Sequence, residues 1–193
     1  MFESPTHYVG EYLKVYVISD THDRLDTLEK FLKIVGAFLE PGYLIHLGDI
    51  VSPFTLRYIV SNLPENLKLK VVLGNNDADK VLISKIAEDV EDQPTEVEFC
   101  GMKALLLHGF KSPELTEKIV DSIACSNYYS VVMYGHTHKY RLNKKCSSYV
   151  LNPGALSGYL AQEATYGVVD CESLTASIVD LETNRVVLSS PIK

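Results

Sequence analysis

The sequence predicts an α/β fold, a layered αββα sandwich in which two mixed β-sheets pack face to face and are flanked by helices. In the first half of the chain, short β-branched runs alternate with segments of helical periodicity, which is typical of parallel strands joined by crossover helices. In the second half, short strand-forming runs follow one another closely, which favours antiparallel hairpins. Helices can cover one face of each sheet while the other two faces pack together, so the sandwich accommodates both halves.

The first half is expected to contain three strands and three helices in alternation. The run LKVYVI at 13–18 is rich in β-branched and aromatic residues and predicts the first strand. Hydrophobic residues at helical spacing from Leu25 to Leu39 predict a helix that has Asp23 as its N-cap and ends before Pro41. The remaining elements of this half are expected as strands at 43–47 and 69–73 and as helices at 53–62 and 80–88.

The second half is expected to be mostly β. Gly101 separates two strand-like runs and predicts a hairpin, and one further helix is expected at 113–125, before the strand YSVVMY at 129–134. The other strands of the second half are expected at 96–100, 102–107, 139–142, 148–151, 166–171, 175–180 and 185–189.

The 193 residues fit a single domain at 12–193, preceded by an N-terminal extension at 1–11. Hydrophobic residues make up 46% of the chain, so it can bury a substantial core without crosslinks. The formal net charge of -7 argues against general binding of nucleic acids, which requires a basic surface. The sequence shows neither a signal peptide nor a run of about 18 apolar residues, so we expect a cytoplasmic protein that does not associate with membranes.

The four cysteines, at positions 100, 125, 146 and 171, include no CxxC pair, so the sequence suggests neither a zinc knuckle nor a thioredoxin-type site. We expect reduced, buried or half-buried thiols in a reducing cytosol. A disulfide in the cytosol of a thermophile is the alternative.

Polar residues occupy the ends of five predicted strands, where the loops of such folds converge and form sites. Asp20 and His22 follow the first strand two residues apart, so their side chains would point the same way in an extended segment. His136 and His138 repeat this spacing after the strand at 129–134. The seven candidate metal ligands at the five strand ends are Asp20, His22, Asp49, Asn75, His108, His136 and His138.

Each of these residues alone has a structural explanation. An aspartate after a strand is often a helix N-cap, an asparagine favours turns, and a histidine at a strand end is usually structural. Together, at successive strand ends of one fold, they indicate a metal centre instead. His46 lies inside the strand at 43–47, and we expect it in the core or behind the ligands.

The five motifs resemble those of the calcineurin-like metallophosphoesterase superfamily, whose members carry DxH, GD, GNxD, a histidine next to glycine, and GHxH in this order. The small size, and Asn152-Pro153-Gly154 after the last motif, are most similar to its compact prokaryotic phosphodiesterases. The resemblance covers residues 13 to 171. The motifs of this chain are Asp20-Thr21-His22, Gly48-Asp49, Gly74-Asn75-Asn76-Asp77, His108-Gly109 and Gly135-His136-Thr137-His138.

The resemblance implies two divalent metal ions per chain, with Asp49 bridging them. One ion would be held by Asp20, His22, Asp49 and His138, and the other by Asp49, Asn75, His108 and His136. Such mixed ligands suit manganese, our first choice, and also nickel, cobalt, iron or zinc, better than magnesium. The charges of two divalent ions, two carboxylate ligands and a bridging hydroxide would give the metal centre a net charge of +1. This net charge suits a monoanionic phosphodiester.

The resemblance further implies that a metal-bridging hydroxide attacks phosphorus, with catalytic positions at Asp49, Asn75, Asn76 and Asp77. Many members of the superfamily have a histidine at the position of Asn76, where it protonates the leaving group. Asparagine cannot act as a general acid, so the sequence predicts a strong dependence on the acidity of the leaving group. Asp77 is expected to stabilise the loop or to support the ligands.

Three functions stay open on the sequence. The first is a phosphodiesterase for small or nucleotide-derived diesters. The second is a phosphomonoesterase or pyrophosphatase with the same metals, which would favour extra cations near them. The basic residues that the sequence does not place are Arg57, Lys111, Lys139 and Arg141. The third is a non-catalytic scaffold, the role that the retromer subunit has with this fold. Several of the twelve tyrosines, clustered between Tyr128 and Tyr166, could then form the interface of a homo-oligomer, although strand formation is the favoured explanation for them.

Overall fold

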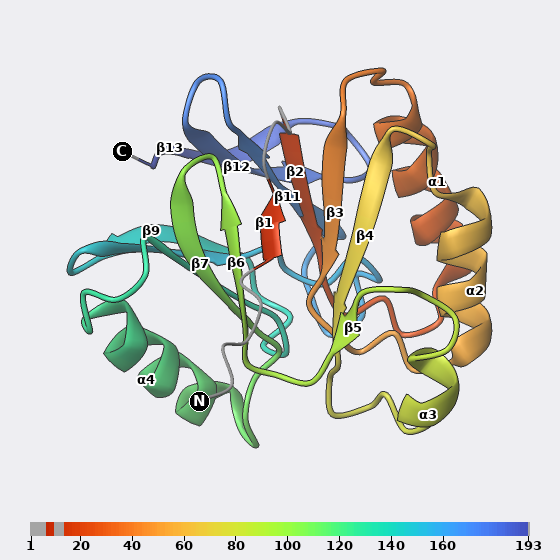
Figure 1. Cartoon of the computed structure of the whole chain (residues 1–193), viewed down its shortest axis with the longest axis horizontal. Coiled ribbons are helices and arrows are strands. Elements are labelled where there is room, and N and C mark those ends of the chain that lie inside the picture. The colour runs from red at the N-terminus through yellow and green to blue at the C-terminus, as the bar shows by residue number, and fades with distance from the viewer. Residues whose placement is uncertain (1–6, 10–13, 193) are drawn as a thin grey trace.

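The computed structural model describes residues 7–9 and 14–192, which form four layers (Figure 1). The first sheet has the strand order β1 (His7–Val9), β6 (Thr95–Phe99), β7 (Met102–Leu107), β8 (Val131–Tyr134), β10 (Ser148–Asn152) and β9 (Arg141–Lys145). The second sheet has the order β13 (Val186–Pro191), β12 (Thr175–Asp180), β11 (Thr165–Asp170), β2 (Lys14–Ile18), β3 (Gly42–His46), β4 (Leu67–Val72) and β5 (Val90–Glu91).

Helices cover the outer face of each sheet. Helices α1 (Leu25–Gly36), α2 (Pro53–Asn62) and α3 (Lys80–Ile83) lie on the side of the second sheet, and α4 (Pro113–Ala124) lies against the first (Figure 1). The predicted αββα sandwich of two mixed sheets is therefore confirmed.

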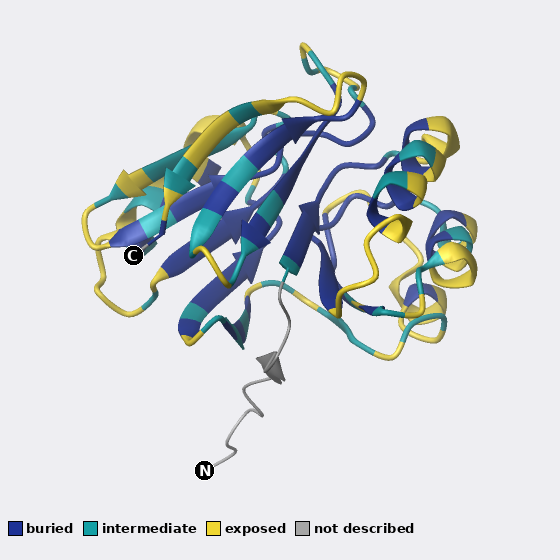
Figure 2. Ribbon diagram, turned by 90° about the horizontal axis from the view of Figure 1, so that it is seen from above, coloured by how far each residue is buried: buried dark blue, intermediate teal, exposed yellow. Residues whose placement is uncertain are grey.

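Three hydrophobic clusters separate the four layers, because strand side chains alternate between the two faces of a sheet. In β2, Val15 and Val17 belong to the large cluster between the sheets. Tyr16 and Ile18 point the other way, into the cluster between the second sheet and its helices. A smaller cluster joins α4 to the first sheet. Figure 2 shows the resulting pattern, with buried strands inside and exposed residues along the outer sides of the helices.

Parallel pairing brings strand ends together at one edge of each sheet. In the second sheet β2, β3 and β4 pair in parallel, so their carboxyl ends lie side by side. In the first sheet β7, β8 and β10 do the same. The loops after β2, β3, β4, β7 and β8 carry the residues that the sequence predicted as candidate ligands.

Several element boundaries differ from the prediction. Helix α3 ends at Ile83 instead of extending to 88, because the chain turns through short-range hydrogen bonds from Lys85 to Leu82 and from Ile86 to Ile83. Helix α1 ends at Gly36 rather than 39 for the same reason, with Phe38 N–H donating to Val35.

The two-residue strand β5 was not predicted, and a buried lysine explains why it forms. Lys70 of β4 is fully buried, and its ammonium group pairs with Asp89 and Glu91, each at 2.7 Å. Both carboxylates belong to the segment that adds β5 to the edge of the sheet. A buried ammonium group requires such partners, so this contact positions the segment more strongly than its own strand propensity does.

The prediction of Asp23 as the N-cap of α1 is wrong. Arg24 occupies the cap position and its side chain makes no capping hydrogen bond. The Asp23 carboxylate instead accepts hydrogen bonds from the backbone N–H of Ser52 (3.0 Å) and the hydroxyl of Thr55 (2.5 Å). It therefore ties the loop before α1 to the start of α2.

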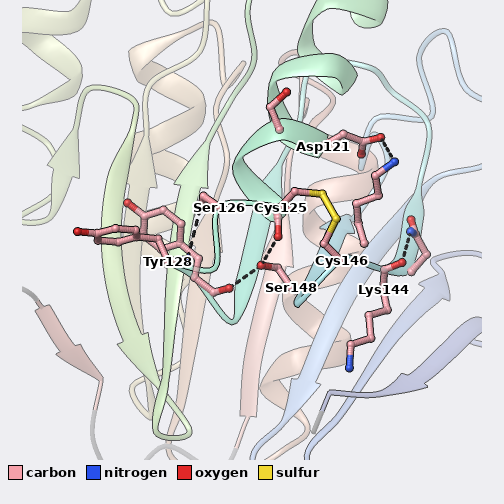
Figure 3. The surroundings of a disulfide bond; sticks show 12 residues. Asp121, Cys125, Ser126, Tyr128, Lys144, Cys146 and Ser148 are labelled. Atoms are coloured by element: carbon pink, nitrogen blue, oxygen red, sulfur yellow. Dashed lines mark hydrogen bonds and ion pairs between the residues drawn. A yellow bond between two sulfur atoms is a disulfide. The ribbon is translucent and has the colours of Figure 1, made fainter.

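The prediction of reduced thiols is also wrong, since the four cysteines form two disulfides. Cys100 follows β6 and is joined to Cys171, which follows β11, so this bond connects the two sheets. Cys125 at the end of α4 is joined to Cys146 in the turn between β9 and β10 (Figure 3). The partners are 71 and 21 residues apart in sequence, and only the tertiary fold brings each pair of Cα atoms to 5.1 Å.

The predicted N-terminal extension at 1–11 lies largely outside the described residues. Its residues 7–9 form β1, which pairs in parallel with β6. The division into an extension and one domain stays a prediction. No helix of the described part of the chain combines the length and the apolar character needed to cross a membrane.

Candidate metal centre

The loops after four strands, β2, β3, β7 and β8, bring six acidic and histidine side chains into two groups. One group contains Asp20, His22 and His138, and the other contains Asp49, His108 and His136. Within each group the candidate ligand atoms all lie within 4.8 Å of one another. Asn75, the seventh residue selected from the sequence, joins the second group, because its Oδ1 lies 3.1 Å from Nε2 of His108.

The first group is centred on a buried carboxylate. Oδ1 of Asp20 lies 3.2 Å from Nε2 of His138 and 3.8 Å from Nε2 of His22. The two imidazole nitrogens are themselves 3.3 Å apart. Three atoms that can all donate electron pairs to a metal therefore converge on one point.

Asp49 connects the two groups. Its Oδ1 lies 3.3 Å from Nε2 of His108 in the second group, and its Oδ2 lies 3.7 Å from Nε2 of His22 in the first. The carboxylate is almost fully buried. Each oxygen thus faces a different group, which is the arrangement that a carboxylate bridging two cations requires.

Backbone carbonyls determine which ring nitrogen is available in three of the four candidate histidines. Nδ1 of His138 lies 2.6 Å from the carbonyl oxygen of Tyr159, and Nδ1 of His108 lies 2.7 Å from that of Leu47. A carbonyl only accepts, so these nitrogens carry the proton and each Nε2 presents a lone pair. In His136 the two nitrogens exchange these roles. Its Nε2 lies 3.0 Å from the carbonyl oxygen of Lys111, so Nδ1 is the nitrogen that can bind a metal.

These donor atoms fit a pair of divalent cations. In the first group, Nε2 of His138 and Oδ1 of Asp20 lie 3.2 Å apart, and both can donate electron pairs to a metal. Oδ1 of Asp20 is buried and finds no hydrogen-bond partner among the described residues. A buried anionic oxygen without a partner is costly, and a cation shared with the neighbouring imidazoles would satisfy it.

The pKa values of the two carboxyl groups, Asp20 and Asp49, agree with the binding of cations. Burial works against ionisation of Asp20, but contacts with His138 and His22 outweigh it and hold the pKa of the carboxyl far below its usual value. Burial also opposes ionisation of Asp49, and there contacts with His108 and Asn76 outweigh it and lower the pKa. Both carboxylates are therefore anionic at neutral pH, as cation ligands must be.

The backbone of the ligand loops is unusual. Five of the seven ligand candidates have a left-handed φ, and these are Asp20, His22, Asp49, His136 and His138, with values from 42° to 66°. The expectation of an extended DxH segment is therefore wrong, and left-handed turns bring the side chains together instead. Residues other than glycine adopt this conformation at an energetic cost, and such residues gather at functional sites.

Two glycines make room for the bridging carboxylate. Gly48 has a φ of 95°, and a Cβ atom there would lie 2.6 Å from the backbone nitrogen of Gly74. A Cβ atom on Gly74 would collide with the carboxylate and the backbone nitrogen of Asp49. The loops after β3 and β4 can approach this closely only because both residues lack a side chain.

Asn76 contacts the bridging carboxylate directly. Its backbone N–H donates to Oδ1 of Asp49 at 2.8 Å, and its side-chain amide donates to Oδ2 at 2.7 Å. Its side chain is exposed. Asn76 therefore lies where a substrate would approach, but it offers only amide protons.

Asp77 lies behind the ligands rather than among them. Its carboxylate is buried and accepts backbone hydrogen bonds from Asp49 (3.0 Å), Val51 (2.7 Å) and Gly74 (2.7 Å). It therefore holds the loops after β3 and β4 together.

His46 and Asn152 also support the loops from within the protein. Nδ1 of His46 accepts from Gly48 N–H, and its Nε2 contacts the hydroxyl of Thr21, both at 3.1 Å. Burial lowers the pKa of His46 to about 4, so the ring is neutral at neutral pH. The Asn152 amide donates to the carbonyl of Gly135, before His136. His46 therefore has the expected position behind the ligands.

Gln93 and Tyr159 also position the ligand loops, although no sequence motif indicated them. The side-chain oxygen Oε1 of Gln93 accepts from the backbone N–H groups of His108 (2.8 Å) and Gly109 (2.9 Å) and so positions that loop. The main-chain carbonyl of Tyr159 orients His138. Neither residue belongs to a motif, and the contact of Tyr159, made through the main chain, leaves no mark on residue type.

The domain model of the calcineurin-like phosphoesterase superfamily matches residues 13–174. The chain belongs to this superfamily and is a phosphoesterase, as the motifs led us to expect. It is 30% identical over 167 residues to the phosphodiesterase MJ0936 of Methanocaldococcus jannaschii. The alignment covers 83% of this chain and 94% of the relative.

Solved structures agree with this membership. The structure of an archaeal phosphodiesterase matches with a TM-score of 0.75 at 30% identity, covering 86% of this chain and 99% of the other. The phosphoesterase Yfce from E. coli matches with a TM-score of 0.71 at 20% identity, covering 93% and 100%. Vps29 from Chaetomium thermophilum matches at 0.68 and 18%, covering 93% and 95%. The last two show a shared fold only.

Proposed function

We propose that this phosphoesterase hydrolyses phosphodiesters with the help of two divalent cations. The observation that carries the proposal is the position of Asp49, whose two oxygens face two separate groups of ligand atoms. The name of the archaeal relative, a phosphodiesterase, supports the choice of a diester.

The proposed ligands divide between the two cations. Asp20, His22 and His138 would hold one, Asn75, His108 and Nδ1 of His136 would hold the other, and Asp49 would bridge them. The mixture of imidazole, carboxylate and amide favours manganese, with nickel, cobalt, iron or zinc as alternatives and magnesium as a poorer fit. When bound, such cations lower the pKa of a water molecule between them and offset negative charge on the phosphoryl oxygens.

A dianionic monoester would favour extra cationic side chains beside the ligands. Arg141 is engaged elsewhere, with Asp121 at 2.8 Å and Asn143 at 2.6 Å. Arg24 is likewise held, by Asp26 at 2.6 Å. Lys139 directly follows His138 in the chain, so the choice of a diester rests on the name of the archaeal relative and not on the surrounding charges.

Asn76 accounts for the expected dependence on the leaving group. Its amide lies against Asp49 and can steady a substrate oxygen, but it cannot supply a proton. In our proposal the leaving group departs as an anion, so its own acidity limits the rate.

The substitution Asn76→His tests this point. A histidine at this exposed position is expected to raise kcat/KM for a diester with a phenol leaving group by roughly tenfold or more, because a well-positioned general acid contributes about 10²–10⁴-fold. The gain for a 4-nitrophenol leaving group should be much smaller, because that anion leaves without protonation. Asn76→Ala is the matched control, which removes the amide without adding an acid. An equal gain for both leaving groups would count against the account.

Metal removal tests the proposed function as a whole. The protein is stripped with a chelator, and Mn, Ni, Co, Zn and Mg are added back separately while hydrolysis of bis(4-nitrophenyl) phosphate and 4-nitrophenyl phosphate is followed. We expect loss of activity on stripping, recovery with manganese, two bound ions per chain by metal analysis, and faster hydrolysis of the diester. Full activity of the stripped protein, or preference for the monoester with every metal, would refute the proposal.

The location and the assembly of the protein remain predictions from the sequence. A cytoplasmic location now has to be reconciled with two disulfides, which persist inside cells mainly in thermophiles. Self-association through exposed tyrosines, of which Tyr128 is an example, awaits a measurement of mass in solution.

A further inference from the structure

The side chain of Gln93 continues a β-ladder at the point where the backbone does not. Strands β6 and β7 pair antiparallel, and the pairing begins with Thr95 opposite Leu106 (Figure 1). In the same register Gln93 would lie opposite His108, but Pro94 has no backbone N–H group and the strand begins only after it. The amide of Gln93 offers the same kinds of donor and acceptor as a peptide group, so it can take over the pairing.

Every backbone polar group of His108 and Gly109 has a partner, and Gln93 supplies three of the four. Oε1 of Gln93 accepts from the N–H groups of both residues, and its Nε2 donates to the carbonyl of Gly109 at 3.0 Å. The fourth group, the carbonyl of His108, accepts from Gly135 N–H at 2.9 Å. Both residues are buried, so loss of the Gln93 amide would leave three backbone groups without partners in a place that water does not easily reach.

We propose that Gln93 positions His108 and thereby sets the affinity of one of the two cations, an inference that rests on the proposed function. We call this ion, which His108 would share with Asn75 and His136, the second cation. The amide of Gln93 fixes the backbone of His108, and the carbonyl of Leu47 fixes its ring through Nδ1. Gln93 is therefore a positioning residue that acts through a ligand and is not a ligand itself.

The effect extends to a second histidine of the same cation. A Cβ atom on Gly109 would lie 2.6 Å from Cβ of His136, so the backbone of Gly109 packs directly against this residue. The rings of His108 and His136 meet edge to face, with their centroids 5.1 Å apart. A shift of the backbone at residues 108 and 109 would therefore disturb both histidine ligands of the second cation.

Gln93 lies in a segment that is anchored on both sides. Before it in the chain, the buried ammonium group of Lys70 pairs with Asp89 and Glu91. After it, the hydroxyl of Thr95 donates to Glu91 at 2.5 Å. Because this segment is fixed by contacts of its own, its amide can determine where the ligand loop lies instead of following that loop.

The two cations depend on different parts of the chain. Within the part of the chain that the structure describes, the hydrogen bonds of the Gln93 side chain all end on residues 108 and 109. The other ion, the first cation, would be held by the loops after β2 and β8, where the carbonyl of Tyr159 orients His138. Removal of the Gln93 amide should therefore weaken one binding step and spare the other.

Calorimetric titration of the metal-free full chain with manganese tests the inference without a need for turnover. The unmodified protein should show two binding steps. In Gln93→Ala the dissociation constant of the second cation should rise about 10- to 100-fold, the usual effect of losing a group that orients a metal ligand, while the first step stays the same. His108→Ala removes a ligand of the second cation and so identifies the step that belongs to it.

A spectroscopic signature and a second variant separate positioning from a general loss of structure. With two manganese ions added per chain, electron paramagnetic resonance should detect a coupled pair in the unmodified protein and an isolated ion in Gln93→Ala. Gln93→Asn keeps an amide and adds no charge, but its shorter side chain cannot reach all three backbone groups. Its second step should weaken by a smaller factor than in Gln93→Ala, and this variant decides the test if Gln93→Ala does not fold.

Asn66→Ala is the matched control, because the amide of Asn66 also holds the backbone of a loop. It donates to the carbonyls of Phe38 at 3.0 Å and Glu40 at 2.7 Å. Asn66 directly precedes β4, so it lies at the amino ends of the parallel strands, opposite to the ligand loops. Its removal should leave both binding steps unchanged, even if the free energy of unfolding falls.

Three results would overturn the inference and leave the proposed function intact. These are a second step that is unchanged in the Gln93 variants, equal weakening of both steps, and weakening of the second step by Asn66→Ala. In each case the unmodified protein still binds two manganese ions. If the unmodified protein binds fewer than two, the proposed function fails and the inference fails with it.

Discussion

The substitution Asp49→Asn is expected to lower kcat/KM for phosphodiester hydrolysis by at least about 10³-fold, which corresponds to about 4 kcal/mol of transition-state stabilisation. Asp49 is the residue whose oxygens face both ligand groups, at 3.3 Å from His108 and 3.7 Å from His22. An amide has nearly the same shape, but it carries no charge and presents one oxygen instead of two. The variant should therefore lose the bridge while keeping the fold.

Steady-state kinetics and metal analysis on the same samples check this expectation. Asp49→Asn should bind fewer than two ions per chain, and its thermal unfolding without metal should remain cooperative. Asp92→Asn provides the matched control, because Asp92 is exposed and only pairs with Lys80 at the surface. Surface pairs contribute little, so the control should retain full activity. Full activity of Asp49→Asn would exclude the bridging role and with it the two-cation centre.

Loss of the disulfide between Cys100 and Cys171 is expected to lower the free energy of unfolding by about 4 kcal/mol. The bond closes a loop of 71 residues in the unfolded chain, and in the chain-entropy model a longer loop gives a larger stabilisation. The same model assigns about 3 kcal/mol to the bond between Cys125 and Cys146, which spans 21 residues. Denaturation by urea, with and without a reductant, measures both values.

Paired serine variants separate the two bonds. Cys100→Ser with Cys171→Ser removes the link between the two sheets, and Cys125→Ser with Cys146→Ser removes the link between α4 and the turn before β10. The first pair should be destabilised more than the second, and titration of thiols in the unmodified protein should find none free. The account fails if neither pair loses stability, or if reduction of the unmodified protein has no effect.

The sequence indicated most strongly those features that depend on residue type at short range. Runs such as KVYVI in β2 mark strands because alternate residues must pack on two faces, and both faces of β2 are indeed buried. Glycines beside Asp49 and Asn75 were recognisable because no other residue allows the loops to approach so closely.

Features that depend on contacts between residues far apart in the sequence could not be predicted from residue type. The strand β5 forms because a lysine buried in β4 requires the carboxylates of residues 89 and 91. The disulfides join residues whose proximity follows from the packing of sheets and helices. The conformation of the DxH segment was expected to be extended, and it is left-handed because the loop is held between neighbouring strand ends.

By itself, therefore, the sequence determined the fold class, most of the strands and their order along the chain, and the identity of the seven residues at the strand ends. These are consequences of hydrophobic periodicity and of chemical type, which each residue carries with it. The tertiary structure alone decided that Asp49 faces both ligand groups and which nitrogen is free in His108, His136 and His138. These depend on backbone carbonyls and on the separation of distant loops, and neither is encoded in the type of any single residue.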